Sequence, residues 1–149
     1  MVEVSFYHLQ VQPLEQALPK LLVKVFERGM KALIRVKEDE MADYLNNLLW
    51  TYQPDSFLPH GLDSEKSPEA QPILISTSVD QNLNDANVLV LLQDTDAADL
   101  ENYDRCLYMF DGNDQSSLGK ARARWKLFKD QGCTVTYWQQ SEKGWQQKA

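Results

Sequence analysis

Val88-Leu89-Val90-Leu91-Leu92 is an unbroken apolar run. A strand that alternates apolar and polar residues has one face in water, whereas a continuously apolar strand is typical of a parallel sheet covered on both faces. We therefore expect this run to be a central strand. Alternation and apolar composition predict five further strands, at Val2 to Tyr7, Lys31 to Val36, Ile73 to Ser76, Arg105 to Phe110 and Thr134 to Trp138.

Segments with helical periodicity separate several of these strands. Leu14 to Val25 carries apolar residues at helical spacing, and Gly29 is a plausible stop. Pro19 interrupts this pattern because an interior proline removes a backbone donor, so the helix either begins near Pro19 or is kinked there. Glu38-Asp39-Glu40 places negative charge at the start of a second helix. A third helix is predicted from about Ser117 to Asp130.

Strands that alternate with helices favour a single three-layer α/β/α domain with a mainly parallel central sheet. We expect the domain to span residues 1–138 and residues 139–149 to be a frayed tail. The connection from Thr51 to Pro72 holds four of the six prolines. Long irregular connections in compact domains are usually functional or mobile. Its second half, Asp63 to Gln71, has the composition of a solvated linker.

The overall composition is acidic and otherwise ordinary for a globular protein. The 149 residues are 43% hydrophobic and carry a formal net charge of −7, which disfavours nonspecific DNA binding unless basic residues cluster. Cys106 and Cys133 lie in or beside apolar runs, which favours a reducing cytoplasm over a disulfide framework. We expect no signal peptide, and no apolar run approaches the roughly 20 residues that span a bilayer.

Signatures of catalysis are sparse. The six glycines are scattered, and the two histidines, His8 and His60, have no cysteines at zinc-site spacing. We expect no metal and no cofactor. One alternative is a Mg²⁺-dependent phosphoryl hydrolase using Asp94, Asp96 and Asp111, which follow two predicted strands. Aspartates are also common in turns, because they form local hydrogen bonds there.

The third predicted helix combines an apolar stripe with cations. The stripe spans roughly 80° of arc at about 100° per residue and consists of Leu118, Ala121, Trp125 and Phe128. Arg122, Lys126 and Lys129 flank it beside Trp125, and we call these four residues the basic patch. Arginine binds a carboxylate through two parallel hydrogen bonds, so the patch suits an acidic peptide with aromatic residues. The alternatives are a solvated basic face and stacking of single-stranded DNA on Trp125.

A second candidate surface is an aromatic loop that follows the second predicted helix. It contains Trp50, Phe57, Leu58, Pro59 and His60. Large apolar side chains in a proline-rich loop either pack inward or dock a partner. We expect Phe57 and Leu58 to be the exposed pair, and His60 to brace the loop through a hydrogen bond.

Several segments, taken in order, resemble the chi subunit of bacterial DNA polymerase III. They are Ser5-Phe6-Tyr7, Glu38-Asp39-Glu40 leading to Leu49-Trp50, Ser56-Phe57-Leu58-Pro59-His60, and Ala121-Arg122-Ala123-Arg124-Trp125-Lys126 ending at Gly132. The tryptophan followed by Phe-Leu-Pro-His is the most specific part. Residues 61–71 and 94–104 carry no signature of the family, and Pro19 is a departure from it.

The resemblance implies a non-catalytic accessory subunit of the clamp-loader assembly in a DNA-directed DNA polymerase. It implies binding to the acidic C-terminal tail of single-stranded-DNA-binding protein and pairing with the psi subunit; a family member also pairs with a repair helicase. DNA would be contacted only indirectly. By position, Arg122, Trp125 and Lys126 match the tail-binding helix, where the family more often has Tyr than Trp. Trp50, Phe57, Pro59 and His60 match the region implicated in pairing with psi or the helicase.

Overall fold

The computed structural model describes residues 2–10, 12–51, 58–64, 67–78, 80–142 and 144–148. Its strands are β1 (Glu3–Leu9), β2 (Ala32–Arg35), β3 (Gly61–Leu62), β4 (Ile73–Ser76), β5 (Val88–Leu91), β6 (Arg105–Asp111), β7 (Thr134–Ser141) and β8 (Gly144–Gln147). Its α-helices are α1 (Leu14–Glu27), α2 (Asp39–Thr51) and α3 (Gln115–Asp130). Short 3-10 turns occur at Pro68–Ala70 and Leu100–Asn102.

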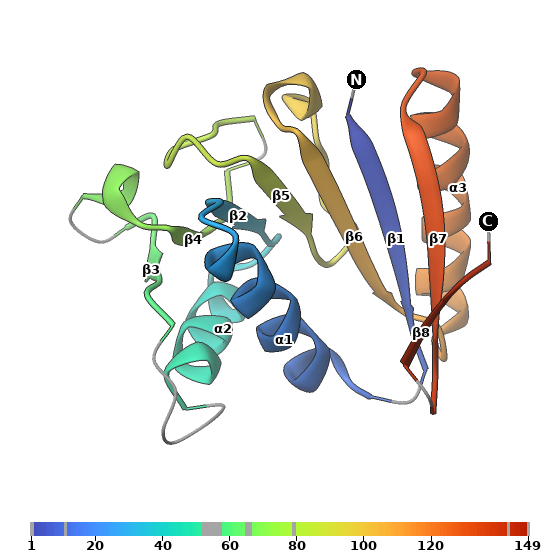
Figure 1. Ribbon diagram of the computed structural model, residues 1–149, viewed down its shortest axis with the longest axis horizontal. Coiled ribbons are helices and arrows are strands. Elements are labelled where there is room, and N and C mark those ends of the chain that lie inside the picture. The colour runs from blue at the N-terminus through green and yellow to red at the C-terminus, as the bar shows by residue number, and fades with distance from the viewer. Residues whose placement is uncertain are drawn as a thin grey trace.

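The strands form one sheet in the order β3-β4-β2-β5-β6-β1-β7-β8 (Figure 1). The paired strands are parallel, except for β7 and β8, which are antiparallel. The apolar run Val88–Leu91 lies between β2 and β6 and is buried along its whole length. The predicted α/β fold with a mainly parallel sheet is therefore confirmed.

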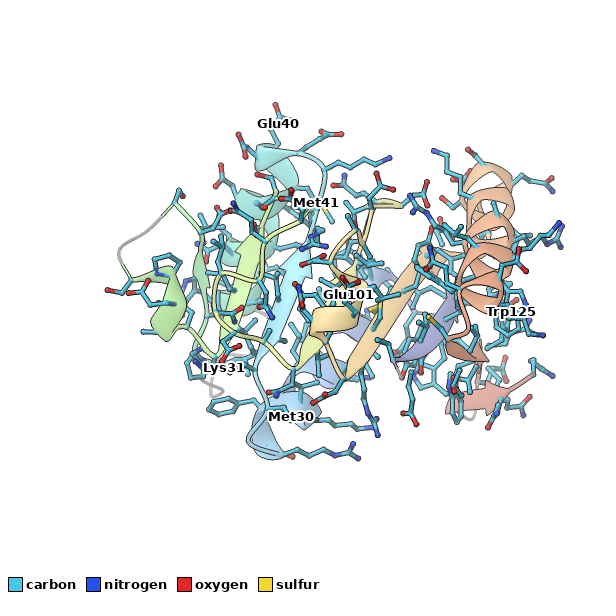
Figure 2. The ribbon with its side chains drawn as sticks, turned by 90° about the horizontal axis from the view of Figure 1, so that it is seen from above. Met30, Lys31, Glu40, Met41, Glu101 and Trp125 are labelled. Atoms are coloured by element: carbon cyan, nitrogen blue, oxygen red, sulfur yellow. The ribbon has the colours of Figure 1, made fainter. Side chains whose placement is uncertain are left out.

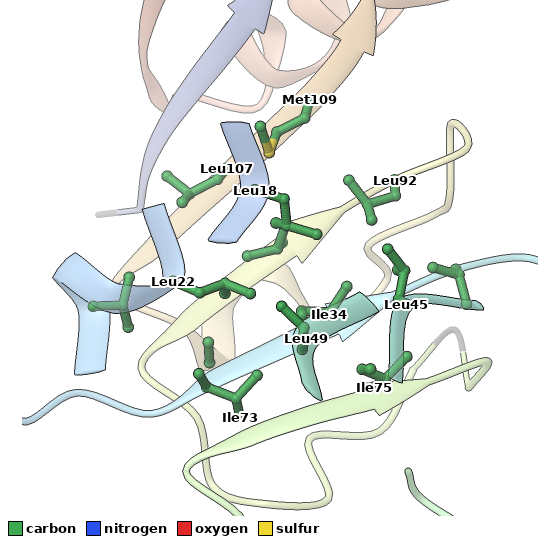
Figure 3. Packing of buried hydrophobic residues seen from close by; sticks show 14 of the residues in the cluster. Leu18, Leu22, Ile34, Leu45, Leu49, Ile73, Ile75, Leu92, Leu107 and Met109 are labelled. Atoms are coloured by element: carbon green, nitrogen blue, oxygen red, sulfur yellow. The ribbon is translucent and has the colours of Figure 1, made fainter. Parts of the chain in front are cut away.

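Helices cover both faces of the sheet, with α1 and α2 on one side and α3 on the other (Figure 1). On the first face, Leu18, Leu22, Leu45 and Leu49 from the helices pack against Ile34, Ile73 and Ile75 from the strands (Figure 3). On the second face, the core includes Phe6, Leu33, Leu74, Cys106, Tyr108 and Phe128. Burial of each Leu, Ile or Phe side chain contributes about 1.5–3 kcal/mol.

Helix α1 is longer than it would be if it began near Pro19, which was one of the two predicted alternatives. It begins at Leu14 and continues through Pro19, so the expectation that it begins near Pro19 is wrong. Pro19 itself is buried, and its neighbours Leu18 and Leu22 are fully covered by the sheet, so packing of this face offsets the missing backbone hydrogen bond. Gly29 has a φ of +73°, the left-handed conformation that ends helices, as predicted.

The C-terminal residues also differ from the prediction of a frayed tail. Strand β7 continues to Ser141 and is followed by β8, which pairs Trp145 with Gln140. The indole of Trp145 packs edge-on against the Tyr7 ring, with 5.0 Å between the ring centroids. This contact lies between residues far apart in the sequence, and the local sequence pattern therefore gave no indication of it.

The connection between α2 and β4 is more regular than expected in its described part. Gly61–Leu62 forms the edge strand β3, parallel to β4. Within the predicted linker, Asp63 donates its backbone N–H to the carbonyl oxygen of Ile75 (3.0 Å), and its carboxylate accepts a hydrogen bond from the Ser76 hydroxyl (2.7 Å). None of the described helices is both long and apolar enough to cross a membrane.

Candidate functional site

Helix α3 presents the predicted apolar stripe to the sheet. Asp114 caps its start, because the carboxylate accepts hydrogen bonds from the Ser117 hydroxyl (2.7 Å) and from the Ser117 backbone N–H (3.2 Å). Ala121 and Phe128 are buried in the second core cluster, with Leu118 and Trp125 packed at its margin. The orientation of the helix predicted from residue spacing is thus confirmed.

Trp125 lies half-buried on α3 (Figure 2), and aromatic rings hold it in place. Its indole packs edge-on against Phe6, at 5.5 Å between centroids, and against Tyr137, at 5.8 Å. The ammonium nitrogen of Lys129 lies 5.6 Å from the centroid of the indole, within the range of a cation–π contact. The inner side of the ring is therefore fixed, while part of it remains open to a partner.

The three cations of the basic patch are exposed. Arg122, Lys126 and Lys129 form no ion pair with any residue in the described part of the chain. The positive charge of Arg122 also acts on Tyr137, whose pKa it lowers, although burial of Tyr137 is the larger effect and raises that pKa. The structure therefore brings Arg122, Lys126, Lys129 and Trp125 onto one surface, with positive charge available for a ligand.

Arg124, on the other flank of α3, is committed to an internal contact. Its Nε lies 2.9 Å from Oδ1 of Asp94, and its Nη2 lies 2.7 Å from Oδ1 of Asp96. Its side chain is only 17% exposed. Asp94 also accepts a hydrogen bond from the Tyr108 hydroxyl (2.7 Å). Burial raises the pKa of Asp94, but the bonds from Tyr108 and Arg124 outweigh burial and leave it below its usual value.

The carboxylates of the three aspartates considered as a magnesium site are engaged in ion pairs or hydrogen bonds with other residues of the chain. Asp94 and Asp96 bind Arg124, and the Asp111 carboxylate accepts the backbone N–H of Asn113 (2.9 Å). Asp94 and Asp111 line a cleft of about 730 Å³ at the carboxyl ends of β1, β5 and β6. Across the described residues, no group of three or more His, Cys, Asp or Glu side chains could hold a metal ion.

The aromatic loop is only partly exposed. Trp50 is 49% exposed, and its indole lies against the His60 ring, at 4.4 Å between centroids. The ring nitrogens of His60 lie 2.7 Å from the carbonyl oxygen of Leu58 and 3.0 Å from that of Asn46, so His60 braces the loop as predicted. Leu58 is 2% exposed and belongs to the core beneath α2, so its predicted exposure is wrong. Pro59 is half-buried, and Phe57 lies outside the described residues.

Comparison with known proteins identifies the family. The family model described as DNA polymerase III chi subunit, HolC, matches residues 1–136, which include both candidate surfaces. The chain belongs to this family.

Two relatives are named as chi subunits. The chain is 35% identical over 98 residues to a protein of Rickettsia prowazekii named "Probable DNA polymerase III subunit chi". That match covers 66% of this chain and 59% of the Rickettsia protein, so the chain spans less than two thirds of that relative's length. It is 28% identical over 122 residues to "DNA polymerase III subunit chi" of Haemophilus influenzae, a match that covers 82% of this chain and 84% of the relative.

In this chi-family chain, His8 lies next to the basic patch. The sequence alone did not indicate that His8 would lie there. His8 is buried, and its Nδ1 is hydrogen-bonded with the Tyr137 hydroxyl. A Cβ atom at Gly112 would collide with the imidazole ring, so a larger residue at this position would force the ring to move. Burial lowers the pKa of His8; the charge of Asp111 opposes this effect, and the charge of Arg122 adds to it.

We expect His8 to titrate below pH 6.5, its ordinary value, when its ring protons are followed by NMR. Because the folded-state pKa is the lower one, the contribution of His8 to stability is complete above pH about 6.5 and is lost as pH falls through the folded pKa. Replacing Arg122 with alanine removes a nearby positive charge and should raise the midpoint. The urea-unfolded chain is the control, and a folded midpoint above the unfolded one would contradict this environment.

Proposed function

We propose that this chain is a non-catalytic accessory subunit of DNA polymerase III in the bacterial replisome. It would join the clamp loader, through the psi subunit, to single-stranded-DNA-binding protein by capturing the acidic C-terminal tail of that protein. Membership of the chi family supports the assignment to the polymerase. The observation that carries tail binding is the basic patch, whose three cations are exposed beside a tryptophan that is fixed from the inside.

The patch offers an acidic, aromatic peptide two kinds of contact. Arg122 can bind a carboxylate through two hydrogen bonds, and Lys126 and Lys129 add positive charge along the same flank of α3. Trp125 supplies apolar surface for an aromatic side chain. Because the chain has a net charge of −7, this attraction is local and should weaken as salt screens it.

The second partner surface would be the aromatic loop. Trp50 presents an exposed indole that lies against the His60 ring, and the ring nitrogens of His60 are hydrogen-bonded to the backbone carbonyl oxygens of Leu58 and Asn46. We propose that Trp50, Phe57, Pro59 and His60 form the contact with psi, or with a repair helicase in its place, while the buried Leu58 anchors the loop to the core. DNA would then be reached only through these partners.

Replacing Arg122 with alanine should weaken binding of an acidic peptide that ends in phenylalanine. The expected loss is on the order of 1–3 kcal/mol, the range for a hydrogen-bonded charge pair. A fluorescence titration of labelled peptide measures it, at low and at raised salt. Lys37→Ala removes an exposed cation outside the basic patch and is the control. If the wild type and Arg122→Ala bound the peptide with equal affinity, the proposal that this patch binds the tail would be wrong.

A further inference from the structure

A groove runs between α1 and the β7–β8 hairpin, on the face of the sheet opposite α3. It consists of two adjoining cavities of about 300 and 400 Å³, which share Leu21, Lys24 and Trp145 among their lining residues. We call it the α1 groove. Among the described residues, those of the basic patch and of the aromatic loop do not line this groove.

One wall of the α1 groove is a row of cations. Lys20, Lys24 and Arg28 occupy positions i, i+4 and i+8 along α1 and its C-cap, so they lie on one side of the helix, roughly 6 Å apart along its axis. All three are exposed, and none forms an ion pair within the described residues. Arg105 adds a fourth cation from β6, and its contact with Glu3 is long, at 3.7 Å, and exposed.

The floor and the opposite wall are apolar and aromatic. They include Tyr7, Val25, Leu107, Trp138 and Trp145. The positive charges act on Tyr7 in this floor. Burial is the largest effect and raises the pKa of the Tyr7 hydroxyl, whereas the charges of Arg105 and Arg28 lower that pKa. Among the described residues that line the two cavities, Glu142 is the one that carries a carboxylate. The groove therefore combines an apolar floor with a positively charged rim, in a chain that is acidic overall.

The architecture leaves space for another helix here. Helices α1 and α2 cover this face over β2, β4 and β6, and Figure 1 shows no described helix over the same face of β7 and β8. Bases stack on aromatic ring faces, whereas the apolar residues that line the cavity of about 300 Å³ include more aliphatic than aromatic side chains, among them Leu21, Val25 and Leu107. A single-stranded nucleic acid is therefore a poorer match than a peptide with aliphatic side chains.

We propose that the α1 groove binds an amphipathic helix of a partner protein whose flank is acidic. Two α-helices have the same rise per residue, so glutamates spaced four residues apart on the partner align with Lys20, Lys24 and Arg28. The apolar stripe of the partner helix enters the groove and contacts Tyr7, Leu107 and Trp145. This site is separate from the basic patch and does not depend on the function proposed for it.

The test uses the full chain and a designed peptide of about 20 residues, long enough to form a helix. The peptide carries a leucine stripe with glutamates along one flank. In ¹H–¹⁵N NMR spectra we expect it to shift the indole N–H signals of Trp138 and Trp145 and to leave those of Trp50 and Trp125 in place. The double variant Lys24→Glu, Arg28→Glu should bind the peptide at least tenfold more weakly.

The matched control is Lys31→Glu, Lys37→Glu, which changes the net charge by the same amount at sites outside the groove and should retain the affinity of the wild type. Equal weakening by both double variants would overturn the proposal, because it would reflect net charge alone. Equal binding of a peptide with the same composition in scrambled order, or tighter binding of a deoxythymidine oligonucleotide at the same indoles, would also overturn it. A shift at Trp125 alone would assign the peptide to the basic patch instead.

Discussion

Replacing Arg35 with alanine is expected to lower the free energy of unfolding by about 3–5 kcal/mol, the cost of breaking a buried ion pair from one side. Arg35 is 0% exposed at the end of β2. Its Nη1 and Nη2 donate to the two carboxylate oxygens of Asp99, at 2.8 and 3.1 Å. Without the guanidinium, the Asp99 carboxylate remains buried with its charge uncompensated. Urea unfolding followed by circular dichroism measures the change.

The exposed ion pair between Arg105 and Glu3 provides the control. Arg105→Ala should cost less than about 1 kcal/mol, because both partners are solvated. Removing both buried charges, in Arg35→Met with Asp99→Leu, should recover part of the loss, because no unpaired charge remains. If Arg35→Ala were as stable as Arg105→Ala, the buried pair would have no such role.

The same pair predicts a dependence on pH. Burial raises the pKa of Asp99, but hydrogen bonds from Arg35 and Tyr103 and the charge of Arg35 outweigh burial, so the net shift is downward. The ionised carboxylate thus stabilises the fold above its unfolded pKa of about 3.9, and this contribution is lost as pH falls through the folded pKa. In Arg35→Ala, burial acts without the guanidinium, so this loss of stability on the acid side should diminish.

Arg35 also connects the sheet to α3. Its Nη1 donates to the carbonyl oxygen of Asp96 (3.1 Å), and the carboxylate of Asp96 accepts from Arg124 on α3. The segment between β5 and β6 thus joins the end of β2 to the helix that carries Arg122. Gln93 and Asp94, in this segment, have φ values of +55° and +54°, an uncommon conformation for residues other than glycine. We infer that the two arginines hold this segment in place.

The strands of the core were predictable because burial on both faces requires apolar residues at nearly every position. Val88–Leu91 and Ile73–Ser76 occur where their composition predicted them. The sequence left the start of α1 open between two alternatives and did not indicate strand β8, because both depend on contacts distant in sequence: Pro19 is tolerated through packing, and Trp145 is held by Tyr7. Local propensity is a weak guide wherever tertiary contacts decide.

The same distinction between local pattern and distant contacts applies to the candidate sites. The spacing of Leu118, Ala121, Trp125 and Phe128 was enough to orient α3 and to place its exposed cations, since helical geometry is regular. Spacing alone did not reveal that Arg124 binds Asp94 and Asp96, since these residues are about thirty positions apart in the chain. Residue spacing also did not reveal the burial of Leu58. An irregular segment has no regular repeat of side-chain directions, so the buried side cannot be inferred from it.

Replacing Phe6 with alanine is expected to destabilise the protein by about 3–5 kcal/mol and to loosen the tryptophan of the basic patch. Phe6 is fully buried in β1 and contacts Tyr108, Phe128 and Trp125, with ring centroids 4.9, 6.1 and 5.5 Å away. Alanine loses the transfer energy of the ring and leaves a cavity directly beneath the indole. Urea unfolding measures stability, and acrylamide quenching of Trp125 fluorescence, with the other three tryptophans replaced by phenylalanine, measures its exposure.

Phe26 supplies the matched control, because it is 38% exposed on α1, and Phe26→Ala should cost much less. Phe6→Leu should fall between the two, since it keeps apolar volume but loses the edge-on ring contact. If Phe6→Ala lowered stability and left the quenching of Trp125 unchanged, the indole would be held by Tyr137 and Lys129 alone. If quenching of Trp125 instead rises from the wild type through Phe6→Leu to Phe6→Ala, as the cavity grows, then β1 positions the indole. A core residue then sets the geometry of a surface that we propose to bind a partner.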